Sequence, residues 1–385
     1  MTTKTNVRFL GVVTAAAFAV ARGTASGASL YAANDGVDTG NCGASAHPCR
    51  SISQAIKHAV SGDTVWVRAG KYGDLNNNGV SDVPGEEQPI TGEAIDCMLC
   101  IFKSVRVLSV YGSAVTVIDT GTNFSVAVAM QADGAVFGLQ GHGFTVKGGG
   151  FTGVEMRTGS YSKVVSNIVE NGIHGSACHG PIYIQDNLVT HSGGDGIVVI
   201  AEDNCPSAGP IYVNGNIVTD SSGSGFALAS IDIVQFVGNV SSHNQTGVRV
   251  ITVAPIGEAK GVIAQNAFVD NQDAGIHFAE GGATVTGNTI LGNQGPGVRV
   301  SVANPRNIVL HQNDIYGNDS AGTPANCGVI NTSAFPVDAK NNYWGSAAGP
   351  GVDPADKAGP GSDCDLGAGV TTVKPFAPTL FPIAP

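Results

Sequence analysis

The sequence predicts an all-β solenoid, a parallel β-helix in which short strands stack coil upon coil. One phrase recurs through the last two thirds of the chain: Asn, an apolar residue, a short polar turn, Gly, and then apolar–x–apolar. The recurring Asn residues lie 20 to 29 residues apart, which is the period of solenoid coils built from short strands. The copies begin at Asn167, Asn187, Asn216, Asn239, Asn266, Asn288, Asn313 and near Asn341.

The composition agrees with such a rod. Glycine accounts for 54 of the 385 residues, and only 13% of the residues are charged. Glycine is thus about twice as frequent as its usual ~7%, which fits a chain of tight turns. The length alone would allow two or three ordinary domains. If the chain is a solenoid, its length no longer implies several domains, because each coil packs only on its neighbours.

The first 28 residues are typical of a secretory signal peptide. Lys4 and Arg8 precede an apolar run over 9–21, and small residues follow up to Ala28, where we expect the cut. No later stretch is apolar enough for a membrane span to be expected. Removal of residues 1–28, which carry three basic and no acidic residues, moves the net charge from −11 to −14. The signal peptide predicts a secreted or periplasmic protein, and the acidic charge argues against binding to nucleic acid.

The remaining chain divides into three parts. Residues 29–62 are expected to form an N-terminal cap with a short helix in 51–60, where apolar residues fall at helical spacing. A solenoid needs this cover over its open end. Residues 63–345 carry the strand pattern of the β-helix. Residues 346–385 are rich in Gly, Pro and Asp, and indicate a loop-like C-terminal cap or tail.

The recurring Asn suits the bend between two strands of a coil. Asn tolerates the left-handed backbone conformation better than most residues do, so we expect it at the bend itself. Stacked copies can pass amide hydrogen bonds from coil to coil as a ladder. Residues such as Asn216 and Asn239 are therefore expected to be buried and paired.

Eight cysteines in an exported chain predict disulfides. Stacked coils lie ~4.8 Å apart, a separation that allows cysteines in the same loop of consecutive coils to pair. Proximity in the sequence, stacked loops and the C-terminal cap give three expected pairs: Cys42–Cys49, Cys178–Cys205 and Cys327–Cys364. No second Cys or His pair stands near Cys97 and Cys100 at zinc-ligand spacing, so a local disulfide is expected there.

Both ends of the mature chain resemble known proteins. The stretch SLYAANDGVDTGNCG…PCRSISQAIKHAVSGDTVWVRAGKYGD resembles the opening of many secreted right-handed parallel β-helix proteins, and NNYWGSAAGPG over 341–351 resembles their closing motif. The resemblance implies a right-handed parallel β-helix of the pectate-lyase-like superfamily, with an N-terminal helix cap. That superfamily includes pectate lyases, other polysaccharide lyases and hydrolases, and epimerases, so the resemblance does not choose a reaction.

The segment DLNNNGVSD matches the pattern of a Ca²⁺-binding loop. Gly79 permits the sharp turn, and Gly85 stands where the bidentate Glu of the pattern would be, so Glu86 or Glu87 would have to replace it. The competing interpretation is a surface loop without metal. If the ion binds, a structural role is expected. The candidate ligands are Asp74, Asn76, Asn78, the carbonyl of Val80, Asp82 and Glu86.

The middle residue of the apolar–x–apolar phrase should point outward from each coil. Three basic side chains would then lie ~4.8 Å apart on an otherwise acidic protein. Arg can pair with a sugar carboxylate or sulfate through two hydrogen bonds. The competing interpretation is an ordinary solvated strand face. The full outward column is Glu155, His174, Val198, Ala227, Arg249, His277 and Arg299. In the resembling lyases this face forms the floor of the substrate groove, and an Arg there can act as the base.

Asp195 is a weaker candidate at the edge of the same face, with His191 four residues before it. A glycosidase needs two facing carboxylates at a defined separation. The next acid at the same phase, Asp273, is expected two coils further on. Asp is also common in turns, which is the competing interpretation.

Two hypotheses for function follow. The first is a secreted or periplasmic protein that binds acidic polysaccharide and, if it is an enzyme, cleaves it as a lyase or glycoside hydrolase. Its candidate residues are Arg249, His277, Arg299 and Asp195. The second is a non-catalytic structural or adhesive rod of the cell envelope. The sequence leaves open whether the protein is an enzyme, which sugar it meets and how it oligomerises.

Overall fold

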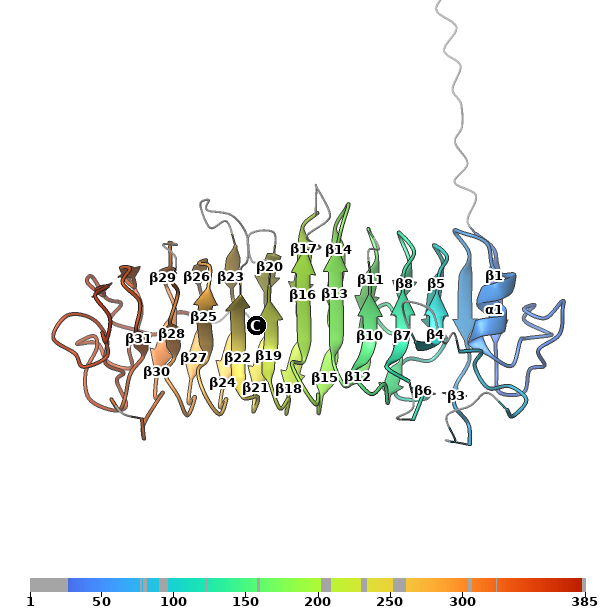
Figure 1. The fold of residues 1–385 in the computed structure, drawn as a ribbon, viewed down its shortest axis with the longest axis horizontal. Helices are drawn as coiled ribbons and strands as arrows, with labels where there is room; N and C mark the ends of the chain where they lie inside the picture. The colour runs from blue at the N-terminus through green and yellow to red at the C-terminus, as the bar shows by residue number, and fades with distance from the viewer. Residues whose placement is uncertain are drawn as a thin grey trace, which may run out of the picture.

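The computed structural model describes residues 27–382 except 77, 79–81, 90–95, 122–123, 158–159, 202–208, 230–233, 252–260, 304–306 and 323. The chain winds into a long stack of coils, with its single described helix at one end (Figure 1). The coils contribute their strands to three parallel sheets that run the length of the rod. The predicted parallel β-helix is therefore confirmed. Most of the predicted signal peptide lies outside the described residues.

The first sheet, here called sheet A, has 13 strands. Its strands in spatial order are β1 (Ser29–Ala32), β2 (Thr64–Val67), β5 (Arg106–Ser109), β8 (Val136–Phe137), β11 (Lys163–Val165), β14 (Ile182–Gln185), β17 (Ile211–Asn214), β20 (Val234–Val237), β23 (Val262–Ala264), β26 (Thr284–Thr286), β29 (Val309–His311), β32 (Val337–Asp338) and β33 (Thr371–Thr372). The last strand comes from the expected C-terminal tail, so that tail is not wholly loop-like.

Sheet B has 10 strands and carries the predicted outward column. Its strands are β4 (Cys97–Ile101), β7 (Val126–Met130), β10 (Thr152–Met156), β13 (Ile173–Ala177), β16 (Ile197–Ala201), β19 (Ser224–Leu228), β22 (Thr246–Ile251), β25 (Ile276–Glu280), β28 (Val298–Val300) and β31 (Val329–Asn331).

Sheet C also has 10 strands. They are β3 (Gly70–Gly73), β6 (Thr116–Asp119), β9 (Thr145–Lys147), β12 (Ile168–Glu170), β15 (Leu188–Thr190), β18 (Ile217–Thr219), β21 (Val240–Ser242), β24 (Ala267–Val269), β27 (Thr289–Leu291) and β30 (Asp314–Tyr316). Alternate residues of all three sheets point into the coil, so one continuous apolar core runs along the axis.

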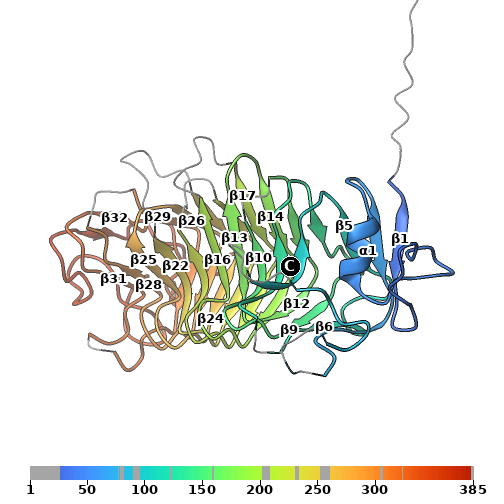
Figure 2. The same ribbon diagram turned by 45° about the vertical axis from the view of Figure 1, so that its right-hand side comes forward.

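Helix α1 (Ile52–His58) covers the N-terminal end of the stack, as Figure 2 shows from the side. Ser51 caps it by accepting a hydrogen bond from the Gln54 amide, and Ile52 and Ala55 pack into the core. Lys103 donates to three carbonyl groups at the other end of the helix. The predicted helix cap is therefore present.

The predicted Asn ladder is confirmed, with one shift of position. Each Asn side-chain oxygen accepts from the backbone N–H of the Asn in the preceding coil, as Asn239 does from Asn216 at 3.0 Å. Its last member is Asn342 and not Asn341. The members are Asn167, Asn187, Asn216, Asn239, Asn266, Asn288, Asn313 and Asn342, all buried.

The expectation that these Asn residues adopt the left-handed conformation is wrong. The left-handed residue is the one immediately before, such as Asp186 at φ 54° before Asn187 or Gly215 at φ 68° before Asn216. The bend therefore turns the Asn side chain inward, where its amide replaces the backbone hydrogen bonds that the bend interrupts.

A second ladder, which sequence analysis missed, lies at the next bend of each coil. Asn244 accepts from the Ser221 amide at 2.8 Å, and Asn271, Asn293 and Asn318 continue the series. It ends on the buried carboxylate of Asp356, which accepts from the Asn318 side chain at 2.7 Å. Its signal is in the sequence, because a second Asn follows the first by five residues in four successive coils.

Candidate functional site

The outward column of sheet B has the predicted register. Arg249 pairs with His277 and His277 with Arg299 in neighbouring strands, and the column runs back to Glu155 without a slip. Not every member faces solvent, however. Glu155 and Ala227 are buried although they lie on the outer side of the sheet, whereas Arg249 is exposed. The three basic-type residues are thus brought together at one end of the column.

Arg299 is not a free cation. Its guanidinium donates two hydrogen bonds to the carboxylate of Asp273, at 2.6 and 3.0 Å. Asp273 lies in the turn before β25, one coil away from Arg299 on β28. The pair is about one-third exposed, so the carboxylate offsets much of the positive charge that the sequence suggested at this position.

His277 lies between the two arginines. Its Nε2 atom is 2.9 Å from the Ser301 hydroxyl, which is also 3.3 Å from the carbonyl oxygen of Phe278. If Ser301 donates to that carbonyl, His277 donates to Ser301 through Nε2. Partial burial and the nearby Arg299 lower the pKa of His277, while Asp273 opposes the shift. His277 is therefore neutral at pH 7, and within the described part of the chain Arg249 has no ion-pair partner.

Asp195 and Asp273 occupy equivalent turns at the edge of sheet B. Asp195 precedes β16 and Asp273 precedes β25, so they are three coils apart, one more than the sequence suggested. Three coils correspond to ~14 Å, which exceeds the separation of ~5–9.5 Å used by glycosidases. Asp195 also accepts from the Ser224 amide at 2.6 Å, as a turn residue does. The pair is not a glycosidase dyad.

A second polar cluster lies nearer the N-terminus of the same face. The buried carboxylate of Glu155 binds Arg157 at 2.6 Å, and His174 Nδ1 lies 4.0 Å from the same oxygen. His174 is about two-fifths exposed. Sequence analysis placed Glu155 and His174 in the column but missed Arg157. The sequence feature that could have identified Arg157 is its position two residues after Glu155, which places both side chains on the same side of an extended chain.

Beside this cluster lies a pocket of about 160 Å³. Its lining joins the start of β10 to β13, β16 and the turn that contains Asp195. Two larger hollows of about 420 and 570 Å³ are lined by loops of the N-terminal cap and, for the larger one, also by residues of the 83–88 segment. The small pocket is lined by Phe151, Thr152, Asn171, Gly172, Ile173, His174, Ser192, Gly194, Asp195 and Val198.

The candidate Ca²⁺ loop is folded around Glu86. This carboxylate is buried and accepts from the backbone N–H groups of Leu75, Asn76, Asp82 and Val83 at 2.9–3.4 Å. The side-chain amides of Asn76 and Asn78 donate to Asp82 at 2.8 and 2.7 Å. Gly79 and Val80 lie outside the described residues.

Glu87, the alternative twelfth ligand, is engaged elsewhere. It accepts from the amides of Ile52 and Ser53 at 2.8 and 2.6 Å, and so caps the N-terminus of α1. Burial raises the pKa of its carboxyl group. In the described part of the loop, oxygen donors for a cation are Asp74, Asn76, Asn78, Asp82 and Glu86, and the two amides would have to turn their oxygens inward.

Three of the four expected disulfides are present in the described part of the chain. Cys42–Cys49, Cys97–Cys100 and Cys327–Cys364 are bonded, with Cα separations of 4.9, 5.8 and 5.9 Å. Cys178 is also disulfide-bonded, and its expected partner Cys205 lies outside the described residues.

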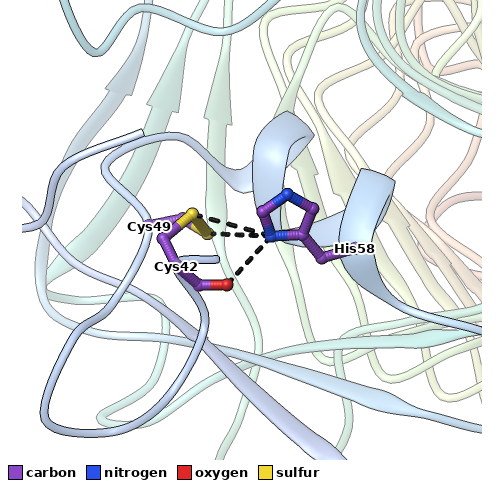
Figure 3. A group of neighbouring side chains, drawn as sticks. All are labelled: Cys42, Cys49 and His58. Atoms are coloured by element: carbon purple, nitrogen blue, oxygen red, sulfur yellow. Dashed lines mark hydrogen bonds between the residues drawn. A yellow bond between two sulfur atoms is a disulfide. The ribbon is translucent and has the colours of Figure 1, made fainter. Parts of the chain in front are cut away.

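The Cys42–Cys49 disulfide is packed against His58 of helix α1. Figure 3 shows the His58 ring facing the bridge, with Nδ1 2.9 Å from the Cys42 carbonyl oxygen and 3.7 Å from its sulfur. Both sulfurs are held in the disulfide and are not the thiolates that a zinc ion requires. The bridge therefore closes the 42–49 loop, and the contact between His58 and the Cys42 carbonyl holds that loop against α1 at the end of the rod.

Comparisons with known proteins agree with this architecture. Residues 171–343 match the family described as the right handed beta helix region, which confirms the handedness predicted from the resemblance. A comparison with curated protein sequences found no match.

Several solved structures are similar in fold. The A-module of the Azotobacter vinelandii mannuronan C-5 epimerase AlgE4 is 16% identical with a TM-score of 0.47, and the alignment covers 83% of this chain and 89% of that one. Pectate lyase Pel9A is 13% identical with a TM-score of 0.40, over 93% of this chain and 80% of that one. The periplasmic alginate epimerase AlgG is 14% identical with a TM-score of 0.42, over 83% and 69%.

Proposed function

From the premise that this chain is a right-handed parallel β-helix protein, we propose that the outer face of β22, β25 and β28 binds an acidic polysaccharide. The observation that supports the proposal most strongly is the gathering of three basic-type side chains on one face of an acidic protein. The sequence carries a net charge of −11, yet three consecutive coils present Arg249, His277 and Arg299 in register on one face.

Each member of this cluster has a distinct contribution. Arg249 is exposed and can pair with a carboxylate or sulfate through two hydrogen bonds. His277 is a neutral hydrogen-bonding group that gains charge when an anion approaches. Arg299 is held by Asp273 in a fixed orientation, so that it offers its remaining guanidinium edge. Together they form a floor for an extended anionic chain that runs along the rod.

Binding without cleavage is the form of this function that the geometry favours. Asp195 and Asp273 are three coils apart, and the Asp273 carboxylate is bound to Arg299. The alternative, a non-catalytic rod of the cell envelope, draws support from the two Asn ladders, which make the coils a continuous hydrogen-bonded stack. The two proposals differ in whether a glycan binds.

The experiment is calorimetric titration of the mature protein with polyuronates and sulfated glycans at low salt. We expect binding that weakens as salt is raised, because the Debye length falls to ~10 Å at 0.1 M. The double variant Arg249→Ala, Arg299→Ala should lose it. Arg106→Ala, an exposed arginine on β5 of sheet A, is the matched control and should bind normally. No binding at low salt, or binding unchanged in the double variant, would reject the site.

We also propose a secreted or periplasmic location. Three described disulfides are typical of proteins that fold in an oxidising compartment. Among the described helices none is long and apolar enough to span a membrane. Fractionation of cells that express the full chain, with the N-terminus of the mature protein sequenced, tests both the location and the expected cut after Ala28.

A further inference from the structure

The pocket beside Phe151 lies on the same strand face as the basic cluster but has different chemistry. Phe151 is 84% exposed, and a single exposed aromatic residue needs no special explanation. Phe151, however, stands at the rim of a hollow that combines the apolar residues Ile173 and Val198 with polar groups. The polar groups include His174, Ser192, Asp195 and the backbone of Gly172 and Gly194. An apolar wall with a few convergent polar groups is the usual make-up of a small-ligand site.

The backbone that presents Phe151 is held in place. Gly148 and Gly149 have φ values of 81° and 82°, a conformation that favours glycine, and Asn171 donates to the Gly149 carbonyl at 2.8 Å. The Phe151 amide donates to the Ser125 carbonyl of the neighbouring coil at 3.0 Å. The ring is therefore displayed on a fixed turn.

We propose that this pocket is a second sugar subsite, which takes one neutral ring of a mixed polysaccharide. The C–H face of the sugar would stack on Phe151, and its hydroxyl groups would bond to His174 and Asp195. The inference rests on the proposed function and extends it, because it places a neutral unit and an acidic unit at fixed positions on one strand face.

The charges of the residues around the pocket determine which kind of sugar unit it can hold. Asp195 lines the pocket, with one carboxylate oxygen accepting from the Ser224 amide, and the nearby Arg157 is bound to the buried Glu155. A uronate in the pocket would meet Asp195, and the described lining residues include no Lys or Arg, whereas a neutral hydroxyl-rich ring finds acceptors and donors. The basic cluster, by contrast, suits the acidic unit.

Geometry sets the distance between the two subsites. His174 on β13 and Arg249 on β22 belong to one column and are three coils apart, which corresponds to ~14 Å. A single oligosaccharide of several units that runs along the rod can therefore touch both. Short fragments would occupy only one subsite at a time, so affinity should rise with chain length until both are filled.

The experiment compares three probes by calorimetry and ligand-observed NMR: hyaluronan oligosaccharides, which alternate acidic and neutral units, oligogalacturonates, which are wholly acidic, and cellohexaose, which is neutral. We expect Phe151→Ala to weaken binding of the mixed oligosaccharide about tenfold, the effect of roughly 1.4 kcal/mol of lost stacking. Binding of the oligogalacturonate should stay unchanged. Phe151→Trp should restore the mixed oligosaccharide. Tyr111→Ala, another exposed aromatic residue, is the matched control.

The outcomes separate the two proposals. If Phe151→Ala binds all probes like the wild type while the double arginine variant loses the acidic ones, the subsite is rejected and the basic cluster stands. If no acidic probe binds, the basic cluster is rejected, and cellohexaose then decides. Weak binding of cellohexaose that Phe151→Ala removes would support the pocket, and its absence would overturn it. Equal melting temperatures confirm that each variant is folded.

Discussion

Arg299 and Asp273 form a two-point ion pair across neighbouring coils, with distances of 2.6 and 3.0 Å. The pair has two opposite effects on the proposed polysaccharide floor. It fixes the guanidinium beside His277, and it places a negative charge where an acidic ligand would approach. Which effect is larger can be measured, because the carboxylate can be removed without touching Arg249 or the core.

We predict that Asp273→Asn increases affinity for an acidic oligosaccharide several-fold. The amide keeps a hydrogen-bonding partner for Arg299 but removes the charge, and partly exposed pairs of this kind contribute ~0.2–1 kcal/mol. Calorimetric titration at two salt concentrations should show a steeper salt dependence than the wild type. A lower affinity would mean that positioning of Arg299 outweighs repulsion by Asp273.

The titration of His277 gives a second prediction. Because its pKa is lowered in the free protein, mainly by burial and by Arg299, the imidazole is neutral until the pH falls below its ordinary value. An anionic ligand favours the charged form and raises that pKa, so binding takes up a proton. Affinity should therefore increase as the pH falls below ~6.5. The increase should vanish in His277→Gln, and a His174→Gln variant should keep it.

Removal of an internal rung should destabilise the whole rod. In Asn239→Leu the amide of Asn216 loses its acceptor, and the carbonyl of Val213 loses a donor that lies at 2.8 Å. Each buried group left without a partner costs ~1–3 kcal/mol. Thermal unfolding followed by circular dichroism should show a clearly lower melting temperature. Gln185→Leu, on the outer side of β14, should change it little, and equal losses in both variants would contradict the ladder argument.

Asp356 predicts a pH dependence of stability. Burial raises its pKa from 3.8 to about 7, although Asn318 donates two hydrogen bonds to it. The folded state therefore holds this proton more tightly than the unfolded chain does. The resulting stabilisation is complete below pH ~3.8 and is lost as the pH rises through about 7. Melting temperatures from pH 4 to 8 should fall less in Asp356→Asn. Asp363→Asn, an exposed carboxylate of the same cap, should keep the wild-type profile.

We predict that Ca²⁺ binds the 74–86 loop and raises the melting temperature by mass action. The ion would take the carboxylates of Asp74 and Asp82, the latter of which accepts hydrogen bonds from the side-chain amides of Asn76 and Asn78. Calorimetry should detect binding that Asp74→Ala removes and that Asp133→Ala, an acid of another coil, leaves intact. If calorimetry detects no heat of binding at millimolar Ca²⁺, the loop does not bind the ion and is held by its hydrogen bonds alone.

Regular repetition made much of the fold predictable. The Asn phase and the apolar–x–apolar phrase placed Arg249, His277 and Arg299 in register, because a one-residue slip would have turned the apolar residues outward. The pairing of Arg299 with Asp273 could not be read in the same way. Those residues are 26 positions apart and meet only because both side chains lean across one coil boundary. The direction in which a side chain leans, unlike the alternation of residues along a strand, produces no periodic pattern in the sequence.

Two residues near the proposed sugar pocket could not be located from the repeat that predicted the fold. Phe151 lies just before strand β10 and Arg157 just after it, so both fall outside the repeated phrase. The pattern that located Glu155 and His174 therefore did not identify them. The repeat therefore gives no guidance at these two positions, whereas it placed Arg249, His277 and Arg299, which lie within the phrase.

In the Asn ladder each backbone N–H donates to the Asn of the next coil, each side-chain amide also donates back to a carbonyl of the preceding coil, and every rung repeats this exchange. A whole coil can therefore be excised without leaving an unmatched amide: if 216–238 were removed, Asn187 would meet Asn239 in place of Asn216. The excision would bring His174 closer to Arg249 by one strand spacing, ~4.8 Å, and leave both untouched. In such a rod, the number of coils between two sugar-binding residues sets the distance between them. That distance can therefore be changed in steps of one coil without changing the residues themselves.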